Sequence, residues 1–294
     1  MNRVLILGGN GYIGGALASS LMASGYHVTV VSRSSITNIE CHRYIQLDLT
    51  KNDACKSLIV DEVDTVIDLV SYIPQNTENV SVSDIKRTLE SYENLLKHIN
   101  DKQYLFFSSG GTVYGNSSMP LSESAPLKPV SPYGVQKCIQ EELIQKLMPK
   151  GVIMRVTNPY GGIQRVKHGV GFVAHLLDCY LNKRTLTLTV PKNTVRDYIH
   201  IDDLIYATKG VLDLNSDVVE IFNISTSHGT SLEELIESLQ EPSRLALAVN
   251  DVAPHNHILC NILDNSKLEN AIKFKIRSRV THFVNHFSHS DSKK

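Results

Sequence analysis

A tyrosine and a lysine four residues apart form the pair in this chain best suited to acid–base chemistry. Tyr133 and Lys137 lie in the stretch SPYGVQK, at an expected helix start. Side chains at positions i and i+4 project from one face of a helix. An ammonium group beside a phenol favours the phenolate, which lowers the phenol pKa from its usual value of about 10. The pair could therefore exchange a proton with a substrate hydroxyl, or it could be two residues that merely share a helix face.

Three glycines near the start of the chain have the spacing of a phosphate-binding turn. Gly8, Gly11 and Gly14 give G-x-x-G-x-x-G between the apolar run at 3–7 and an expected helix. A turn without side chains lets backbone N–H groups and the helix N-terminus hold a pyrophosphate. The apolar run at 27–33 completes a strand–helix–strand unit, the context that this motif requires. The sequence therefore predicts a dinucleotide site rather than a plain turn.

The end of the second strand indicates which dinucleotide binds. NAD sites usually place Asp or Glu there for the ribose 2′-hydroxyl, whereas this chain has Ser32 followed by Arg33. A guanidinium can pair with a 2′-phosphate in a charge-assisted fork, and an acidic residue would repel that phosphate. The sequence favours NADP(H) and leaves NAD(H) open. Arg33 could also be a solvated charge at the end of a strand.

The elements that would position these residues alternate along the chain. Further strands and helices are expected at 43–49, 63–70, 83–99, 103–109, 132–148 and 151–158. Strands that alternate with helices imply a parallel sheet covered on both faces. We therefore expect an α/β fold with a doubly wound parallel-sheet Rossmann domain at 1–158. A smaller α+β domain at 159–294 is expected to bind mainly the substrate, with parts of about 195–225 returning to the Rossmann core.

Composition narrows the class of protein. The chain has 294 residues, 42% of them hydrophobic, and a formal net charge of −1, which is ordinary for a soluble globular protein. The near-neutral charge gives no indication of a nucleic-acid or acidic-membrane partner. Five scattered cysteines without C-x-x-C argue against a disulfide framework and favour a cytoplasmic location. Neither a signal peptide nor a membrane span is expected from the sequence.

Two other chemistries are disfavoured. His255 and His257 form H-x-H, but no third ligand lies nearby in the sequence, so we expect surface histidines and no metal site. The chain also lacks G-x-S-x-G, the nucleophile turn of many serine hydrolases.

Several motifs, in order along nearly the whole chain, resemble the extended short-chain dehydrogenase/reductase family, or NAD-dependent epimerase/dehydratase family. The resemblance is strongest to its nucleotide-sugar epimerases and 4-ketoreductases. The motifs are GGNGYIG (8–14), LDLT (47–50), FSSGGTVYG (107–115), SPYGVQK (131–137), NPYG (158–161) and RDYIHIDDL (196–204).

The resemblance implies roles for particular residues. Tyr133 would be the acid–base residue, and Lys137 would assist it and bond the cofactor ribose. Cofactor contacts are implied for Gly8, Gly11, Tyr12, Ile13, Gly14, Asp48, Leu49 and Leu69. Substrate contacts are implied for Asn158, Tyr160, Arg196 and Tyr198.

One position departs from the family pattern. Alignment on TVYG places the catalytic Ser/Thr of the family at Gly110. In an extended strand, residues i and i+2 share a face, so Thr112 shares the face of position 110 and is the favoured replacement. A backbone loosened by glycine could instead turn Ser109 inward. A water molecule or the substrate itself is the remaining alternative.

These residues suit two reactions at C4 of a nucleotide sugar. The first is NADPH-dependent reduction of a dTDP- or other NDP-4-dehydro-6-deoxy-sugar, which Arg33 favours because reductases draw on NADPH. The alternative is a UDP-hexose 4-epimerase with a retained cofactor, and a further alternative is a non-catalytic dinucleotide-binding sensor. Dehydration is disfavoured because Gly111 and Thr112 stand where dehydratases carry Asp-Glu. The resemblance also implies a role in polysaccharide or O-antigen synthesis, and it allows a homodimer.

Overall fold

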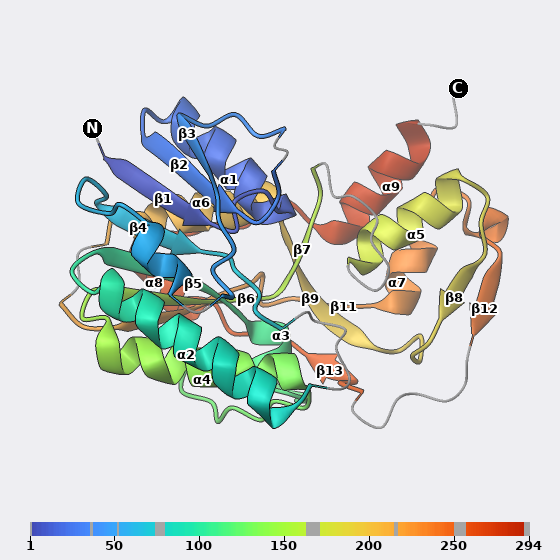
Figure 1. The fold of residues 1–294 in the computed structure, drawn as a ribbon. Helices are drawn as coiled ribbons and strands as arrows, with labels where there is room; N and C mark the ends of the chain where they lie inside the picture. Colours follow the sequence, from blue (N-terminus) through green and yellow to red (C-terminus); the bar gives the residue numbers. More distant parts are fainter. Residues whose placement is uncertain are drawn as a thin grey trace. The chain divides into compact units, whose positions relative to one another are not determined.

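The chain divides into two units, each with its own sheet (Figure 1). The structure is a computed structural model that describes residues 2–35, 38–51, 53–73, 80–162, 171–214, 217–249 and 257–290. The first unit comprises Met1–Val113, Pro129–Arg155 and Thr208–Phe222, and the second Tyr114–Lys128, Val156–Ala207 and Asn223–Lys294. Helix α6 (Ile201–Leu212) begins in the second unit and ends in the first.

The first unit is built on a seven-stranded sheet in the order β10-β6-β5-β4-β1-β2-β3. The strands are β1 (Arg3–Leu7), β2 (His27–Ser32), β3 (Arg43–Gln46), β4 (Thr65–Asp68), β5 (Gln103–Ser109), β6 (Gly151–Val156) and β10 (Glu220–Ile224). The pairs β1–β2, β1–β4, β2–β3 and β4–β5 are parallel. The doubly wound α/β fold expected from the alternating elements is confirmed.

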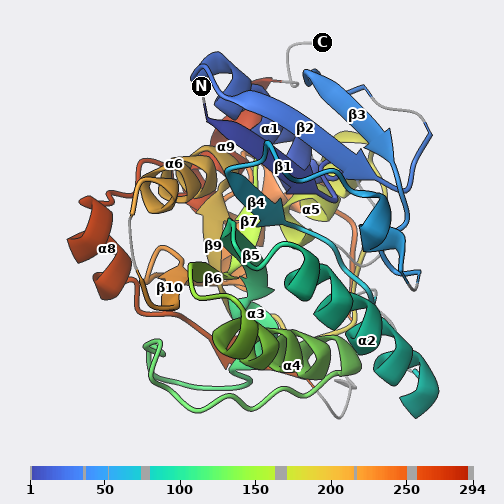
Figure 2. The same ribbon diagram turned by 60° about the vertical axis from the view of Figure 1, so that its left-hand side comes forward.

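Helices α2 and α4 lie together on one face of this sheet, and α1 lies on the other (Figure 2). The helices of this unit are α1 (Tyr12–Ala23), α2 (Val82–His98), α3 (Gly110–Val113) and α4 (Pro132–Leu147), with a 3-10 turn at Ala54–Ser57. Leu5, Tyr92, Phe106 and Ile144 belong to the buried cluster between α2, α4 and the sheet. Strands β1 and β4 are buried along almost their whole length, as both-face coverage requires.

The second unit contains a four-stranded sheet and a two-stranded sheet. The first sheet holds β7 (Asn158–Tyr160), β9 (Val195–His200), β11 (Gly229–Ser231) and β13 (Cys260–Asn261). The second pairs β8 (Leu186–Leu188) with β12 (Leu247–Val249). The remaining elements are α5 (Phe172–Leu181), α7 (Leu232–Glu237), α8 (Ser266–Ile272), α9 (Val280–Ser290) and a 3-10 turn at Pro242–Arg244.

Helices α5, α7 and α9 pack together over the core of the second unit. Leu176, Tyr180, Leu235 and Val284 are buried in this cluster. None of the helices in the described part of the chain is both long enough and apolar enough to span a membrane.

Candidate active site

The glycine turn after β1 is built from close backbone contacts that exclude side chains. Gly8 has a φ of +77°, and a Cβ there would lie 3.1 Å from the carbonyl carbon of Leu69. A Cβ on Gly14 would lie 2.6 Å from both the Cα and the carbonyl oxygen of Gly9. Only glycine adopts this φ freely and avoids these contacts. The turn therefore brings the start of α1 against the ends of β1 and β4.

The first turn of α1 is suited to an anion. Gly11 is the N-cap, and the cap has no side-chain hydrogen bond and no acidic residue in the turn that follows. Backbone N–H groups at a helix N-terminus and the helix dipole favour negative charge. Tyr12 and Ile13, the first two helical residues, are half-buried. The glycine turn thus has the close backbone approach and the polarity that a dinucleotide pyrophosphate requires.

The other residues predicted to contact the cofactor lie at the ends of β2, β3 and β4. Arg33 follows β2 and is exposed, and within the described ranges no carboxylate forms an ion pair with it. Asp48 is half-buried and accepts hydrogen bonds from the backbone N and the Oγ1 of Thr50, at 3.1 and 2.7 Å. The side chain of Leu49 lies in the core beside α2, so it contributes packing. Leu69 is half-buried, and its backbone lines the turn at Gly8.

The start of α4 places Tyr133 and Lys137 on the buried face of the helix. Ser131 caps the helix by accepting a hydrogen bond from the backbone N–H of Gly134 at 3.1 Å, and Pro132 follows the cap. Tyr133 is 9% exposed and Lys137 is 2% exposed. The Nζ of Lys137 lies 5.8 Å from the centroid of the Tyr133 ring. The structure therefore brings the two residues together inside the first unit.

Ser109 lies beside the phenol of Tyr133. The side chain of Ser109 is hydrogen-bonded to the hydroxyl of Tyr133. Strand β5 ends at Ser109, and Gly110–Val113 form the short helix α3. The expectation that Thr112 shares a strand face with position 110 is wrong, because the chain is no longer extended there. The hydroxyl of Thr112 donates to the carbonyl oxygen of Ser109 at 3.3 Å.

Burial controls the protonation of the pair. It raises the pKa of Tyr133 to about 12, and the hydrogen bond with Ser109 acts in the opposite direction. Burial also lowers the pKa of Lys137 to about 8, against the attraction of Asp68 and Glu141. The pKa of Tyr133 is therefore raised and not lowered as expected from the neighbouring Lys137, because desolvation of the phenolate dominates. At neutral pH, Tyr133 keeps its proton and Lys137 is mostly charged.

Buried charged residues lie behind the pair, and the sequence motifs did not predict them. Glu141 of α4 forms a buried ion pair with Arg155 of β6, at N–O distances of 2.7, 3.1 and 3.3 Å. The hydroxyl of Ser108 donates to the same carboxylate at 2.5 Å. Asp68, the last residue of β4, accepts a hydrogen bond of 2.6 Å from the hydroxyl of Tyr104. The sequence indicates such residues only by a polar side chain within or beside an apolar run, as Asp68 in β4 and Arg155 in β6.

The residues predicted to bind substrate all lie in the second unit. Asn158 is half-buried, and its Nδ2 donates to the backbone oxygen of Asp197 at 2.8 Å. Tyr160 is fully buried against the rings of His200 and Phe283, with centroids 5.1 and 5.3 Å away. Tyr160 is therefore a core residue of this unit.

Arg196 and Tyr198 are two residues apart on β9, so they share a face of the strand. The Nη1 of Arg196 donates to the backbone oxygens of Val195 and Leu259, at 2.8 and 3.5 Å. Among the described residues, no carboxylate forms an ion pair with Arg196. Tyr198 is buried and lines a cavity of about 150 Å³ that also contacts Arg279.

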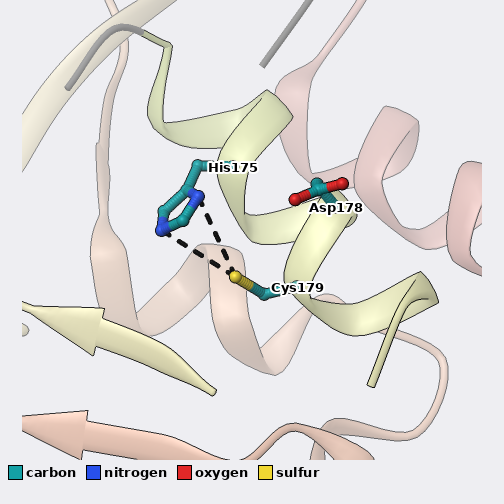
Figure 3. A group of neighbouring side chains, drawn as sticks. All are labelled: His175, Asp178 and Cys179. Atoms are coloured by element: carbon teal, nitrogen blue, oxygen red, sulfur yellow. Dashed lines mark hydrogen bonds between the residues drawn. The ribbon is translucent and has the colours of Figure 1, made fainter. Parts of the chain in front are cut away.

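One group of side chains has the composition of a metal site. His175, Asp178 and Cys179 lie one turn apart on α5, with ligand atoms within 4.8 Å of one another (Figure 3). Both oxygens of Asp178 have other partners, since Oδ1 accepts from Asn182 and Oδ2 pairs with Arg184. The closeness of these three side chains follows from their spacing on one helix face, and the carboxylate oxygens of Asp178 are already engaged by Asn182 and Arg184.

Of the two histidines considered in the sequence, His257 is half-buried, and its Nε2 is 2.9 Å from the Oγ1 of Thr194. His255 lies outside the described residues.

The parallel sheet, the glycine turn and the buried Tyr–Lys pair define a dinucleotide-dependent enzyme of the short-chain dehydrogenase/reductase class. The family described as the NAD dependent epimerase/dehydratase family matches residues 4–225. The chain belongs to this family, as its motifs predicted.

Curated relatives include both types of enzyme suggested by the sequence. A putative UDP-glucose 4-epimerase of Methanocaldococcus jannaschii is 28% identical over 252 residues, 81% of each chain. A dTDP-4-dehydro-6-deoxyglucose reductase of Escherichia coli is also 28% identical, over 258 residues and 81% of each chain. Among solved structures, the UDP-glucose 4-epimerase of Thermus thermophilus with NAD is similar, with a TM-score of 0.81 and 25% identity. The match covers 98% of this chain and 99% of that chain.

Substitution of Gly14 tests the glycine turn. Gly14→Ala should lower the free energy of unfolding by about 1–3 kcal/mol, because the new Cβ would overlap the backbone of Gly9. Gly11→Ala is the matched control. Its Cβ would meet the oxygen of Gly8 at an ordinary 3.4 Å, so the loss should be smaller, about 0.5–1 kcal/mol, and should come from the poorer helix cap that alanine makes. Urea unfolding measures both values, and equal losses in the two variants would contradict the close approach.

Proposed function

We propose that this protein transfers hydride at C4 of a nucleotide sugar, with Tyr133 as the acid–base residue. The observation that carries the proposal is the arrangement of three side chains within one unit. The hydroxyl of Tyr133 is buried and hydrogen-bonded to Ser109, and the charged Lys137 lies one helical turn away. A dinucleotide-binding sensor has no need of a desolvated acid–base pair.

Each residue of the arrangement has a chemical task. Tyr133 exchanges a proton with the oxygen at sugar C4, and Ser109 holds the phenol hydroxyl in place. Lys137 supplies positive charge that stabilises the phenolate when Tyr133 has given up its proton. A dinucleotide whose pyrophosphate is held at the glycine turn would bring the nicotinamide that supplies or accepts the hydride. Burial of Tyr133 and Lys137 keeps bulk water away from the proton transfer.

The second unit offers groups for the nucleotide diphosphate. Arg196 is half-buried, and the hydrogen bonds that hold it go to backbone oxygens, so its positive charge suits phosphate oxygens. Tyr198 shares its strand face and lines the adjoining cavity. Asn158 retains its amide oxygen as an acceptor, because only Nδ2 is used on Asp197. Tyr160 would shape this region from the core rather than touch the sugar.

Within this chemistry we favour the 4-ketoreductase. The protonated state of Tyr133 at neutral pH is the form that donates a proton to a 4-keto oxygen. Exposed Arg33 at the end of β2 suits the 2′-phosphate of NADPH. The epimerase is the second candidate, because relatives such as the UDP-glucose 4-epimerase of Lactobacillus helveticus are 27% identical over 277 residues.

The decisive assay offers the protein both substrates. We expect it to consume NADPH when given dTDP-4-dehydro-6-deoxyglucose, with product and oxidised cofactor formed in equal amounts. Interconversion of UDP-glucose and its 4-epimer without net cofactor consumption would favour the epimerase. No reaction with either substrate would contradict the proposal.

Tyr133→Phe removes the proton donor and retains the ring. Turnover should fall by roughly 10²–10⁴-fold while the thermal unfolding midpoint stays close to that of the unchanged protein. Steady-state kinetics and thermal unfolding measure the two quantities. Wild-type turnover in this variant would contradict the role of Tyr133.

The hydroxyl beside Tyr133 can be identified with two parallel substitutions. Ser109→Ala should lower kcat by about tenfold or more, because a hydrogen bond to a catalytic group is worth about 1.5–3 kcal/mol when charge is involved. Thr112→Val should change kcat by less than about threefold, since the hydrogen bond of that hydroxyl within the described residues goes to the backbone oxygen of Ser109. A larger loss of kcat in Thr112→Val than in Ser109→Ala would show that Thr112 is the hydroxyl that assists Tyr133.

Arg33→Ala tests the cofactor preference. If the guanidinium pairs with a 2′-phosphate, KM for NADPH should rise by about tenfold or more, while KM for NADH changes little. Arg43→Ala is a matched control, because Arg43 is also an exposed arginine at the sheet edge, in β3. Equal effects on the two cofactors would show that Arg33 does not recognise the 2′-phosphate.

A further inference from the structure

A carboxylate and two tyrosines are buried on the face of the sheet that α4 covers. Asp68 ends β4 and is fully buried, and it pairs in register with Phe106 of β5. Tyr104 lies two residues before Phe106, on the same face, and its hydroxyl donates to Oδ2 of Asp68 at 2.6 Å. The hydroxyl of Tyr92, from α2, lies 3.0 Å from that of Tyr104.

Lys137 reaches this same group from α4. Its Nζ lies 4.3 Å from the centroid of the Phe106 ring and donates to the backbone oxygen of Phe107 at 2.9 Å. These groups satisfy part of the hydrogen-bonding and polarisation needs of an ammonium, but neither carries a negative charge. A buried charge without a countercharge is strongly unfavourable. A neighbouring carboxylate would therefore favour the charged form of Lys137 over the neutral amine.

The carboxylates of Asp68 and Glu141 both favour the charged form of Lys137, and Glu141 already has a cationic partner. Glu141 is held by Arg155 through both of its oxygens, so that ion pair is close to neutral as a whole. The hydrogen bonds that Asp68 accepts come from Tyr104 and the backbone N–H of Val70, which are neutral donors. The charge of Asp68 is therefore available to balance the ammonium.

We propose that Asp68 is a positioning residue that keeps Lys137 charged at neutral pH, with Tyr104 and Tyr92 holding the carboxylate in place. The inference rests on the proposed function, because a charged Lys137 matters for turnover only if Tyr133 forms a phenolate. Asp68 acts through Lys137 and has no assigned contact with substrate.

The hydrogen bonds that link Tyr92, Tyr104 and Asp68 support the charge of the carboxylate and do not form a proton path. Tyr92 and Tyr104 are both fully buried, so the chain ends inside the core between α2 and the sheet. The titratable groups around Asp68 and Lys137 are Tyr72, Tyr92, Tyr104, Tyr133, Glu141 and Arg155.

The directions of the pKa shifts agree with this arrangement. Burial raises the pKa of Asp68, and the charge of Lys137 is the largest opposing effect. Burial lowers the pKa of Lys137 to about 8, and the charge of Asp68 is again the largest opposing effect. Loss of the Asp68 charge must therefore lower the pKa of Lys137 further and leave more of it neutral at neutral pH.

Direct titration of Lys137 tests the inference without any turnover. Protein labelled with ¹³C at lysine Cε is titrated by NMR, and the Lys137 signal is assigned by its absence in Lys137→Met. The midpoint should lie near 8 in the unchanged protein and should fall by about 1 unit or more in Asp68→Asn. An unmoved midpoint in Asp68→Asn would overturn the inference.

Asp203→Asn is the matched control, because Asp203 is also fully buried and accepts hydrogen bonds from the backbone N–H groups of Arg277 and Ser278. It should leave the Lys137 midpoint unchanged. If Asp68→Asn does not fold, Tyr104→Phe decides, since it removes the hydrogen bond that favours the Asp68 charge. A smaller fall of the Lys137 midpoint would then support the inference, and no fall would overturn it.

The pH profile of turnover is the second readout. In Asp68→Asn the alkaline limb of kcat should move to lower pH by the same amount as the Lys137 midpoint. A purely structural role would lower kcat by the same factor at every pH and would contradict the inference. If the protein turns over neither nucleotide sugar, the proposed function fails, while the NMR titration still decides the link between Asp68 and Lys137.

Discussion

The buried ammonium of Lys137 is the constraint around which the first unit is organised. A charge at that depth needs a hydrogen-bond acceptor, a polarisable surface and a countercharge. Strand β5 supplies the Phe107 carbonyl and the Phe106 ring, and the neighbouring strand β4 supplies the Asp68 carboxylate. The same burial keeps the proton on Tyr133, so the resting state of the pair is set by desolvation.

The inner face of α4, which carries Lys137, is polar over most of its length. Its buried residues are Tyr133, Gly134, Gln136, Lys137, Gln140, Glu141 and Ile144. A helix that only filled the core would present apolar side chains at these positions. Gly134 belongs to the same design, because a Cβ there would lie 2.9 Å from the backbone oxygen of Thr112. That close approach brings α4 against α3 and places Tyr133 beside Ser109.

The sequence predicted the parts of the fold and site that depend on local pattern. The strand at 103–109 has the predicted bounds, and the glycine turn lies between β1 and α1 as expected. Thr112 was favoured over Ser109 because residues 110–112 were treated as extended, whereas Gly110–Val113 form the helix α3. The alternation of side chains in a strand therefore does not apply to position 112.

Other features could not be predicted because they join residues that are distant in the sequence. Tyr104 and Asp68 are 36 residues apart, and their hydrogen bond exists only because β4 and β5 pair in register. The raised pKa of Tyr133 likewise depends on burial by the whole unit, whereas i, i+4 spacing reports only that Lys137 is near. Local spacing therefore predicts that Tyr133 and Lys137 are neighbours, and long-range packing sets their burial and charge.

The most direct test of the account follows hydrogen at sugar C4. The protein is incubated with an NDP-4-dehydro-6-deoxy-sugar and NADPH carrying deuterium at the transferable position of the nicotinamide, and the product is analysed by mass spectrometry and NMR. If hydride is transferred at C4, the product should carry deuterium at C4. Tyr133 should deliver the proton that the C4 oxygen receives. Product without deuterium at C4 would contradict hydride transfer at this site.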